Sequence, residues 1–211
     1  MTQIPNAVNS ANVTSASNAM NASEKKAIVG LWGIFALRML GLFMIVPVFS
    51  VYGSQYAHAT PLLIGLAIGM YGLGQAIFQI PMSLLADKLP RKPIIIAGLL
   101  VFALGGVICA LSTDIYMVIF GRFIAGSGAV SAVVMALLAD VTREQHRTKA
   151  MAAMGLTIAM SVMVAFGVGP LLTHILDISG LFWVTVVSAL LAIGLLAIVP
   201  TPTRVLKHNL A

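Results

Sequence analysis

Six apolar stretches constrain this chain more than any other feature of its sequence. They cover residues 27–52, 62–86, 93–112, 115–139, 150–173 and 181–199. Each has about 20 residues or more, which at a rise of about 1.5 Å per residue is enough for a helix to cross a hydrocarbon core of about 30 Å. Strands are excluded because the stretches are too long and do not alternate, so helices must satisfy the backbone in lipid. We therefore predict an all-α membrane protein, a bundle of six transmembrane helices.

The residue composition excludes a soluble domain. Apolar residues, counted as Ala, Val, Ile, Leu, Met, Phe, Trp, Tyr and Cys, make up 60% of the chain, charged residues make up 9%, and the mean hydropathy is +1.03. A soluble domain carries about 25% charged residues. The formal net charge is +6, but the basic residues are scattered, without the dense basic face of a nucleic-acid-binding protein. We therefore expect the lipid bilayer, and no nucleic acid, as a partner.

The sequence contains no motif typical of an enzyme. It lacks the patterns H-E-x-x-H and G-x-S-x-G, which are typical of metalloproteases and serine hydrolases. Its single cysteine, Cys109, excludes a disulfide framework and a cysteine cluster for metal. We therefore predict that the protein is not an enzyme and has no catalytic residues, no metal site and no cofactor.

Composition divides the chain into three parts. We predict that residues 1–26 form a disordered polar cytoplasmic tail, because the first 23 residues carry no charged side chain and nine of them are Asn or Ser. This tail lacks the basic start and continuous apolar run of a secretory signal. Residues 27–200 are predicted to form the six-helix transmembrane domain, and residues 201–211 a short cytoplasmic tail.

The basic residues predict how the six helices are oriented. Ten of the twelve Lys and Arg residues fall on one side of an alternating topology, and the connections 53–61, 112–114 and 174–180 on the other side contain none. Because cytoplasmic connections carry an excess of Lys and Arg, both termini and the connections 2–3 and 4–5 are predicted to be cytoplasmic. The protein is then a multi-pass protein of the inner or plasma membrane. The ten residues are Lys25, Lys26, Lys88, Arg91, Lys92, Arg143, Arg147, Lys149, Arg204 and Lys207.

The two remaining basic residues lie inside predicted spans. Arg38 lies near the middle of the first stretch, and Arg122 lies about seven residues into the fourth. A charge within the membrane is unfavourable by a few kcal/mol, so it normally faces a partner or a water-filled cavity. No Asp or Glu lies deep in any stretch to pair with them. Two interpretations follow: hydrogen bonds to carbonyls or hydroxyls that serve packing, or a polar cavity for translocation.

Polar and small residues predict which helix faces point inward. Tyr71, Gln75 and Gln79 are spaced by four residues and share one face of the second helix. Because lipid-facing glutamines are unfavourable, this face is predicted to point into the protein, either lining a pore or joining helices. Small residues allow membrane helices to approach closely, and the candidates for such packing are Gly65, Gly69, Gly126 and Gly128.

The connection after the second helix carries a longer motif. Residues 83–95 read Ser-Leu-Leu-Ala-Asp-Lys-Leu-Pro-Arg-Lys-Pro-Ile-Ile. This segment resembles the loop signature of the major facilitator superfamily, G-x-L-A-D-[RK]-x-G-R-[KR]-x-x-[ILV]. Ser83 and Pro90 replace its two glycines. The matching positions are Leu85, Ala86, Asp87, Lys88, Arg91, Lys92 and Ile95.

Further segments resemble the same family. Residues 121–129 are similar to its helix-4 signature R-x-x-Q-G-x-G-A, with Ala125 in place of the usual Gln. Gly169 and Pro170 partly match its antiporter signature and are added to the packing candidates. Residues 38–47 and 136–145 are most similar to a YajR-like, drug-efflux branch. The resemblance covers about residues 27–200, which corresponds to the N-terminal six-helix half of such a transporter.

This resemblance implies alternating access, in which two six-helix halves move about a central site. It implies a cytoplasmic charge latch formed by Asp87, Arg91, Lys92 and Asp140, whereas the alternative is that the basic residues only set the topology. It also implies proton-coupled efflux of a small molecule, although the six stretches contain no carboxylate or histidine that would carry a proton. Arg38, Gln75, Gln79 and Arg122 are the intramembrane candidates for translocation.

Because such a transporter has twelve helices, we expect this chain to be either a truncated form or one half that pairs with a second six-helix half or with its own copy. A transporter of a small solute or drug is the first functional hypothesis. The alternative is a six-helix membrane scaffold or regulatory partner that transports nothing. The sequence does not specify the substrate.

Overall fold

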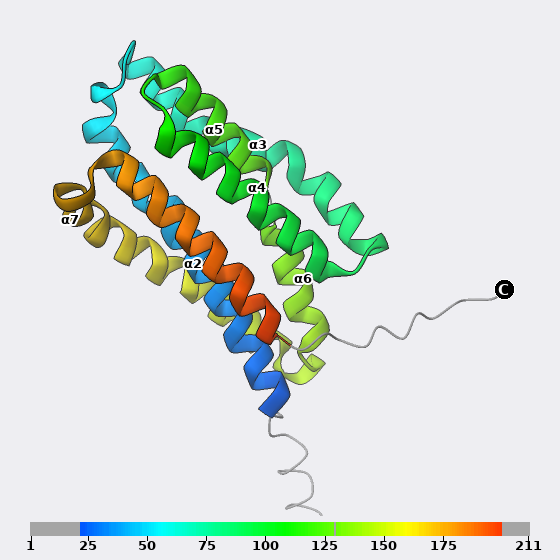
Figure 1. Ribbon diagram of the computed structural model, residues 1–211. Helices are drawn as coiled ribbons and strands as arrows, with labels where there is room; N and C mark the ends of the chain where they lie inside the picture. Colours follow the sequence, from blue (N-terminus) through cyan, green and yellow to red (C-terminus); the bar gives the residue numbers. More distant parts are fainter. Residues whose placement is uncertain (1–21, 129, 200–211) are drawn as a thin grey trace, which may run out of the picture.

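The computed structural model describes residues 22–128 and 130–199 and is built from helices, with a 3-10 turn η1 (Gly53–Gln55) after the first of them (Figure 1). Six helical segments are long and apolar enough to cross a membrane: Lys25–Gln55, Pro61–Lys88, Arg91–Leu111, Ile115–Val141, Glu144–Thr173 and Ile175–Ile198. The predicted all-α bundle of six spans is therefore confirmed. The α-helices are α2 (Ala22–Tyr52), α3 (Pro61–Lys88), α4 (Arg91–Leu111), α5 (Ile115–Ser127), α6 (Ser131–Val141) and α7 (Glu144–Ile198).

The helix boundaries differ from the predicted ones at the start of α2 and α7. Residues 22–26 are helical although they were assigned to the polar tail, and α7 begins at Glu144 although its apolar stretch begins near residue 150. Both extensions are rich in Ala, Glu, Gln, Lys and Arg, which are good helix formers outside as well as inside the membrane. The predicted tails at residues 1–21 and 201–211 lie outside the described residues.

Two further features differ from the prediction: the fourth span is interrupted, and the fifth and sixth spans are joined without a loop. The fourth span is divided, with α5 ending at Ser127 and α6 beginning at Ser131. The fifth and sixth spans form the single element α7, which is broken at Asp177, where φ is 56° and ψ is −179°. The predicted loop 174–180 is thus a sharp break at one residue. This combination of φ and ψ lies outside the left-handed helical region and is adopted almost only by glycine. We call residues 144–173 the first limb of α7 and residues 175–198 the second limb.

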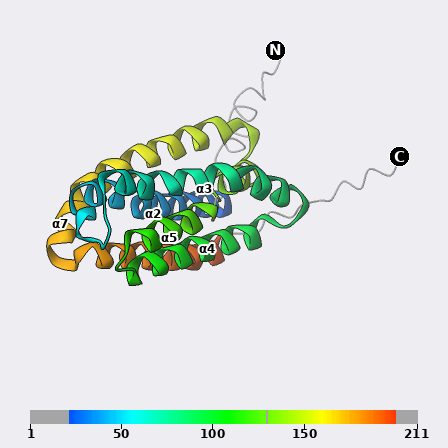
Figure 2. The same cartoon turned by 90° about the horizontal axis from the view of Figure 1, so that it is seen from above.

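Helix α2 packs against both limbs of α7, as the two views of the bundle show (Figures 1 and 2). Gly169 on the first limb has no room for a side chain, because a Cβ atom there would lie 2.8 Å from the Met44 carbonyl oxygen. On the second limb, the Thr185 hydroxyl donates to the Gly41 carbonyl oxygen at 3.3 Å. Pro170 is half-buried within the first limb. Helix α2 is therefore in close contact with both limbs of α7.

Glycines also set the crossings of α5 with α3 and α4. A side chain at Gly126 would collide with the backbone of Tyr71 on α3, and one at Gly128 would collide with the backbone of Gly98 on α4. Both residues therefore lie where helices approach most closely, as small residues do in membrane bundles.

Gly65 and Gly69 do not pack against another helix among the described residues, so their predicted role in helix packing stays a prediction. Both are exposed, and a Cβ atom built on either meets no other atom within 4 Å. The same helix does pack through Gly74, whose Cβ would lie 2.5 Å from the Phe123 carbonyl oxygen. Sequence alone does not distinguish these glycines, because which face of α3 meets α5 depends on the crossing geometry.

One side of the bundle is much less buried than the rest. The apolar windows of the second span (α3) and the fifth span (first limb of α7) are each 17% buried, whereas those of the other four spans are 44–56% buried. Large apolar side chains cover this side, and we call it the open face: Leu66, Leu73, Phe78, Met160, Met163 and Phe166.

The connections at one end of the bundle are tied to each other. Ala57 accepts a backbone hydrogen bond from Ile115 at 3.2 Å and donates one to Thr113 at 3.0 Å. Beside it, His58 Nδ1 lies 2.8 Å from an Asp114 carboxylate oxygen, and Asp114 also caps α5 by accepting from the Tyr116 backbone N–H at 2.8 Å. We call these contacts the outer clasp, because they join the connections predicted to lie outside the cell.

The outer clasp is expected to weaken in acid. The backbone hydrogen bond from Tyr116, followed by the bond with His58, holds the pKa of Asp114 below its ordinary value of 3.8. A carboxyl group with a lowered pKa stabilises the fold above its unfolded pKa and loses this contribution as the pH falls through its folded pKa. We therefore expect Asp114→Asn to lower the thermal midpoint at pH 6 but not at a pH well below 3.8. Thermal unfolding of the detergent-solubilised chain across this range is the test, and a midpoint difference between the two proteins that stays constant down to low pH would contradict the expectation.

Candidate functional site

The middle of the bundle holds a buried arginine whose partners are all neutral. Arg38 on α2 is 1% exposed. Its guanidinium donates to the Ser131 hydroxyl at 2.5 Å, the Tyr71 hydroxyl at 3.0 Å and the Gly128 carbonyl oxygen at 3.4 Å. It also lies 5.6 Å from the centroid of the Phe102 ring. Because a buried charge is tolerated only where it is hydrogen-bonded, these oxygens hold the cation within the apolar bundle.

The interruption of the fourth span supplies two of these oxygens. Gly128 follows the last residue of α5 and has φ −71° and ψ 40°, which are not helical values. The last carbonyl groups of a helix have no partner within it, so the Gly128 oxygen is available to Arg38. Ser131 is the first residue of α6. The sequence analysis missed this interruption, although the run Gly-Ser-Gly at residues 126–128 consists of poor helix formers.

A second buried arginine lies on the other side of Tyr71. Arg122 on α5 is 3% exposed, and its Nε donates to the Ala67 carbonyl oxygen at 3.3 Å. Its guanidinium carbon lies 5.0 Å from the centroid of the Tyr71 ring, so one tyrosine bonds Arg38 through its hydroxyl and faces Arg122 through its ring. Arg122 also lines a small cavity of about 10 Å³ with Cys109 and Thr185, a volume close to the minimum for one water molecule.

The site formed by Arg38 and Arg122 can act on other groups through its positive charge. Arginine stays protonated in proteins, so Arg38 and Arg122 supply two fixed positive charges rather than a proton carrier. The Arg38 Nε has no hydrogen-bond partner among the described residues, which leaves one donor of the cation unused. No group of three or more His, Cys, Asp or Glu that could hold a metal ion occurs within residues 22–128 and 130–199.

Along the predicted polar face of α3, the side chains become more exposed from Tyr71 to Gln79. Tyr71 is buried against Phe102, with ring centroids 6.2 Å apart, Gln75 is half-buried, and Gln79 is exposed. Only the first of the three residues therefore lies in the interior of this chain. The helices of this chain do not cover Gln79, so the prediction that this face lines a pore or joins helices stays a prediction.

The charged residues of the motif at residues 83–95 lie at the end of the bundle opposite to the outer clasp. The Arg91 Nε on α4 lies 2.9 Å from an Asp140 carboxylate oxygen on α6, which joins the 2–3 connection to the end of the fourth span. The Lys92 ammonium donates to the Val199 carbonyl oxygen beyond the end of α7. Asp87 lies in the last turn of α3 and is exposed. Arg91, Lys92 and Asp140 thus contact residues of other elements, and the sequence alone could not specify these partners.

Comparisons with known proteins agree with this arrangement. The family model described as Major Facilitator Superfamily matches residues 31–210. The chain belongs to the major facilitator superfamily, a family of multi-pass membrane transport proteins, as the motif predicted. Over 192 residues it is 50% identical to the inner membrane transport protein YajR of Escherichia coli (strain K12), an alignment that covers 90% of this chain and 42% of the relative.

More distant relatives share the same half. The chain is 32% identical over 158 residues to the class H tetracycline resistance protein of Pasteurella multocida, covering 73% of this chain and 38% of that protein. Among solved structures, a bacterial homologue of the human lysosomal transporter Spinster, inward-facing and unoccupied, matches with a TM-score of 0.62 and 16% identity. That match covers 88% of this chain and 45% of the other, and it supports the fold. The chain thus spans less than half the length of these relatives.

Proposed function

We propose that this chain forms one six-helix half of a transporter that moves a small solute or drug across the cell membrane by alternating access. The observation that carries the proposal is the open face, because the second and fifth spans are each only 17% buried while the other four pack closely. Alternating access requires such a face, on which a second half can move between two arrangements. The chain would have both termini and the Arg91–Asp140 pair in the cytoplasm.

The partner in this proposal is a second six-helix half that covers the open face. A test is to express the chain in cells alone and together with the C-terminal half of the 50%-identical E. coli relative. The full-length relative serves as the positive control for whichever compounds it transports. We expect lower accumulation of those compounds only when both halves are present. If accumulation falls with the chain alone, blue-native electrophoresis with crosslinking is expected to detect a homodimer.

An unchanged accumulation with both halves present, when both are inserted in the membrane and bind each other, would contradict the transport proposal. That outcome would favour the alternative function of a scaffold or regulatory partner, because such a protein needs membrane insertion and association but no movement between arrangements.

The charge latch is proposed to control that movement. The Arg91–Asp140 pair joins α4 to α6 at one end of the bundle, and Asp87 lies exposed beside it at the end of α3. Charges near helix ends can hold one arrangement and release it when helices separate. In this proposal the latch stabilises the outward-open arrangement through contacts with the second half.

Removing a latch carboxylate is expected to stop transport without preventing insertion. Asp87→Asn and Asp140→Asn should each lower the export rate by about tenfold or more, which corresponds to about 1.4 kcal/mol in the balance between arrangements. Glu144→Gln is a matched control, because it removes an exposed carboxylate from the first turn of α7. Export is measured in cells that carry both halves at equal membrane levels. Normal export by the two Asp variants would leave only a topological role for this segment.

Proton coupling is proposed to depend on the second half. The six apolar stretches contain no Asp, Glu or His, the side chains that usually form proton relays in transporters. If export is driven by protons, the proton-carrying side chain then belongs to the partner half, and Arg38 and Arg122 act on it as fixed charges.

A further inference from the structure

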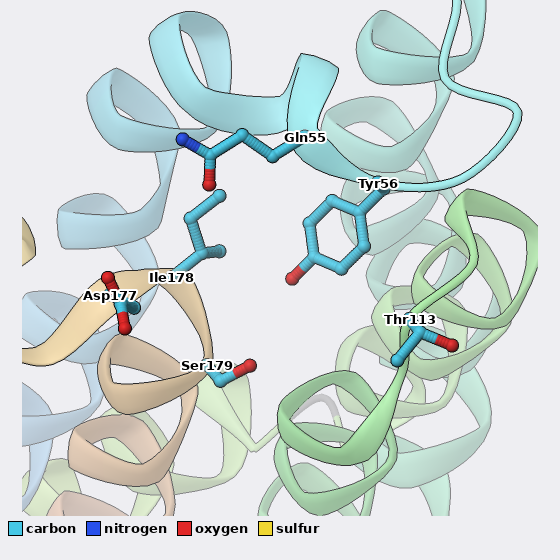
Figure 3. Close-up of a pocket in the computed structure, with 6 residues that line it drawn as sticks. All are labelled: Gln55, Tyr56, Thr113, Asp177, Ile178 and Ser179. Atoms are coloured by element: carbon cyan, nitrogen blue, oxygen red, sulfur yellow. The ribbon is translucent and has the colours of Figure 1, made fainter.

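A polar pocket lies at the outer end of the bundle, where three connections meet (Figure 3). Its volume is about 390 Å³, which is within the range of about 300–1,000 Å³ for small-molecule sites. The residues come from the end of the first span, the connection between α4 and α5, and the break in α7. They are Gln55, Tyr56, Thr113, Asp177, Ile178 and Ser179.

A buried hydroxyl group in this pocket lacks a partner. Tyr56 is 9% exposed and its ring packs 5.7 Å from the ring of Phe49. Its hydroxyl oxygen is buried and has no hydrogen bond to any described residue. In Figure 3 this hydroxyl points into the space between Ser179 and Thr113. Buried polar groups are nearly always satisfied, so a water molecule or a ligand is required here. Burial raises the pKa of Tyr56, so the group is a neutral phenol that can both accept and donate.

The pocket also holds an unpaired negative charge. Asp177, at the break in α7, is exposed and has no hydrogen bond or ion pair among the described residues. The three outer connections contain no Lys or Arg that could neutralise it. The other acid at this end, Asp114, is already bound by His58 and by the Tyr116 backbone N–H. The local charge therefore favours a positively charged ligand.

The shape and the donor set indicate which cation fits. A bare metal ion needs several oxygen atoms converging at about 2.0–2.6 Å, and a pocket of 390 Å³ with one carboxylate does not provide such a cage. A primary ammonium group instead carries three N–H donors. Asp177 lines the pocket and supplies the counter-charge, with its carboxylate at the edge, on the other side of Ile178 from the Tyr56 hydroxyl (Figure 3). The hydroxyls of Tyr56 and Ser179 also line the pocket and can accept N–H donors.

We propose that this pocket binds the primary ammonium group of a small amine at the outer surface of the membrane, through Asp177, Tyr56 and Ser179. The ammonium group can come from a free amine in the surrounding medium or from the headgroup of an aminophospholipid, since the pocket lies where the apolar spans end. The proposal does not depend on transport, because it concerns the outer end of this chain alone.

Binding of ethanolamine to the purified full chain in a neutral detergent tests the proposal. Saturation-transfer NMR with a concentration series gives the dissociation constant. We expect saturable binding of ethanolamine, at least tenfold weaker binding of choline, which lacks N–H donors, and no binding of ethylene glycol, which lacks the charge. Asp177→Asn should weaken ethanolamine binding at least tenfold, and Tyr56→Phe about three- to tenfold.

We expect both variants to keep the fold, so a loss of ethanolamine binding can be attributed to the pocket. Asparagine has nearly the same size and shape as aspartate, so it makes the same demands on the backbone at position 177, and phenylalanine keeps the ring of Tyr56 in place. Glu144→Gln removes a carboxylate at the other end of the bundle and should leave binding unchanged. Circular dichroism and size-exclusion elution verify the fold of each variant.

A second arm distinguishes the two sources of the ammonium group. The chain is placed in nanodiscs of phosphatidylcholine with or without phosphatidylethanolamine. If phosphatidylethanolamine abolishes ethanolamine binding in a manner that requires Asp177, the pocket holds a lipid headgroup, and if it has no effect, the ligand is a free amine. Absence of saturable ethanolamine binding up to about 50 mM in detergent, equal binding of choline, or unchanged binding by Asp177→Asn would each overturn the proposal.

Discussion

Arg38→Ala is expected to lower the free energy of unfolding by about 3–5 kcal/mol. The substitution leaves a cavity in the middle of the bundle. It also removes the donor that Tyr71, Ser131 and the Gly128 carbonyl share. Any gain from removing a buried charge is small, because the guanidinium is already hydrogen-bonded to three oxygens. Unfolding of the chain by SDS titration from mild detergent measures the change.

Arg38→Met separates the structural role of Arg38 from a role in transport. Methionine fills nearly the same volume without a charge, so it avoids most of the cavity, but it leaves the three oxygens that Arg38 binds without their donor. We expect a loss of about 1–3 kcal/mol for this variant, smaller than that of Arg38→Ala, together with loss of export when the second half is present. Normal export by a stable Arg38→Met protein would show that Arg38 serves packing only, which is the other interpretation of its position.

Gly126→Val is expected to lower the free energy of unfolding by about 3 kcal/mol, whereas Gly69→Val on α3 should change it by less than about 0.5 kcal/mol. A side chain at Gly126 collides with the backbone of Tyr71, which cannot move without displacing α3. A Cβ atom at Gly69 meets no other atom within 4 Å. The same SDS titration measures both variants.

The two glycine variants also report on the open face. If the second half covers this face as proposed, Gly69→Val should reduce association with that half although it leaves the isolated chain unchanged. Equal destabilisation of the isolated chain by the two variants would mean that α3 does not cross α5 at Tyr71 and Gly126.

The lengths of the apolar stretches and the positions of the basic residues were sufficient to predict the six spans and which connections share an end of the bundle. Both signals are local, because the length of an apolar stretch and the charge of a short loop do not depend on how helices cross. The motif at residues 83–95 was equally readable, since its residues are contiguous in the sequence.

The partners of Arg38 could not be predicted in the same way. Ser131 is separated from it by 93 residues, and its approach depends on where the fourth span is interrupted. The glycines show the same limit, since Gly65 and Gly126 look alike in the sequence but only the second meets another helix. The outer pocket was also missed, because it is built from three connections that are each too short to carry a recognisable motif.

Arg38 and Arg91 both contact the part of the fourth span that follows α5. Gly128 and Ser131 bind Arg38 at its start, and Asp140 binds Arg91 near the end of the short helix α6 that follows. A displacement of α6 would therefore affect both groups of charges. This connection gives a physical route by which the end of the bundle that carries Arg91 and its middle can change together.

Cysteine accessibility in intact cells tests the central claim, which is that this chain crosses the membrane six times with its basic connections in the cytoplasm. In a Cys109→Ser background, single cysteines replace Pro90 and Gln145 at one end and His58 and Ser179 at the other. A membrane-impermeant maleimide added from outside is expected to label positions 58 and 179, and to label positions 90 and 145 only after the cells are opened. Labelling of positions 90 and 145 on opposite sides of the membrane would contradict the account.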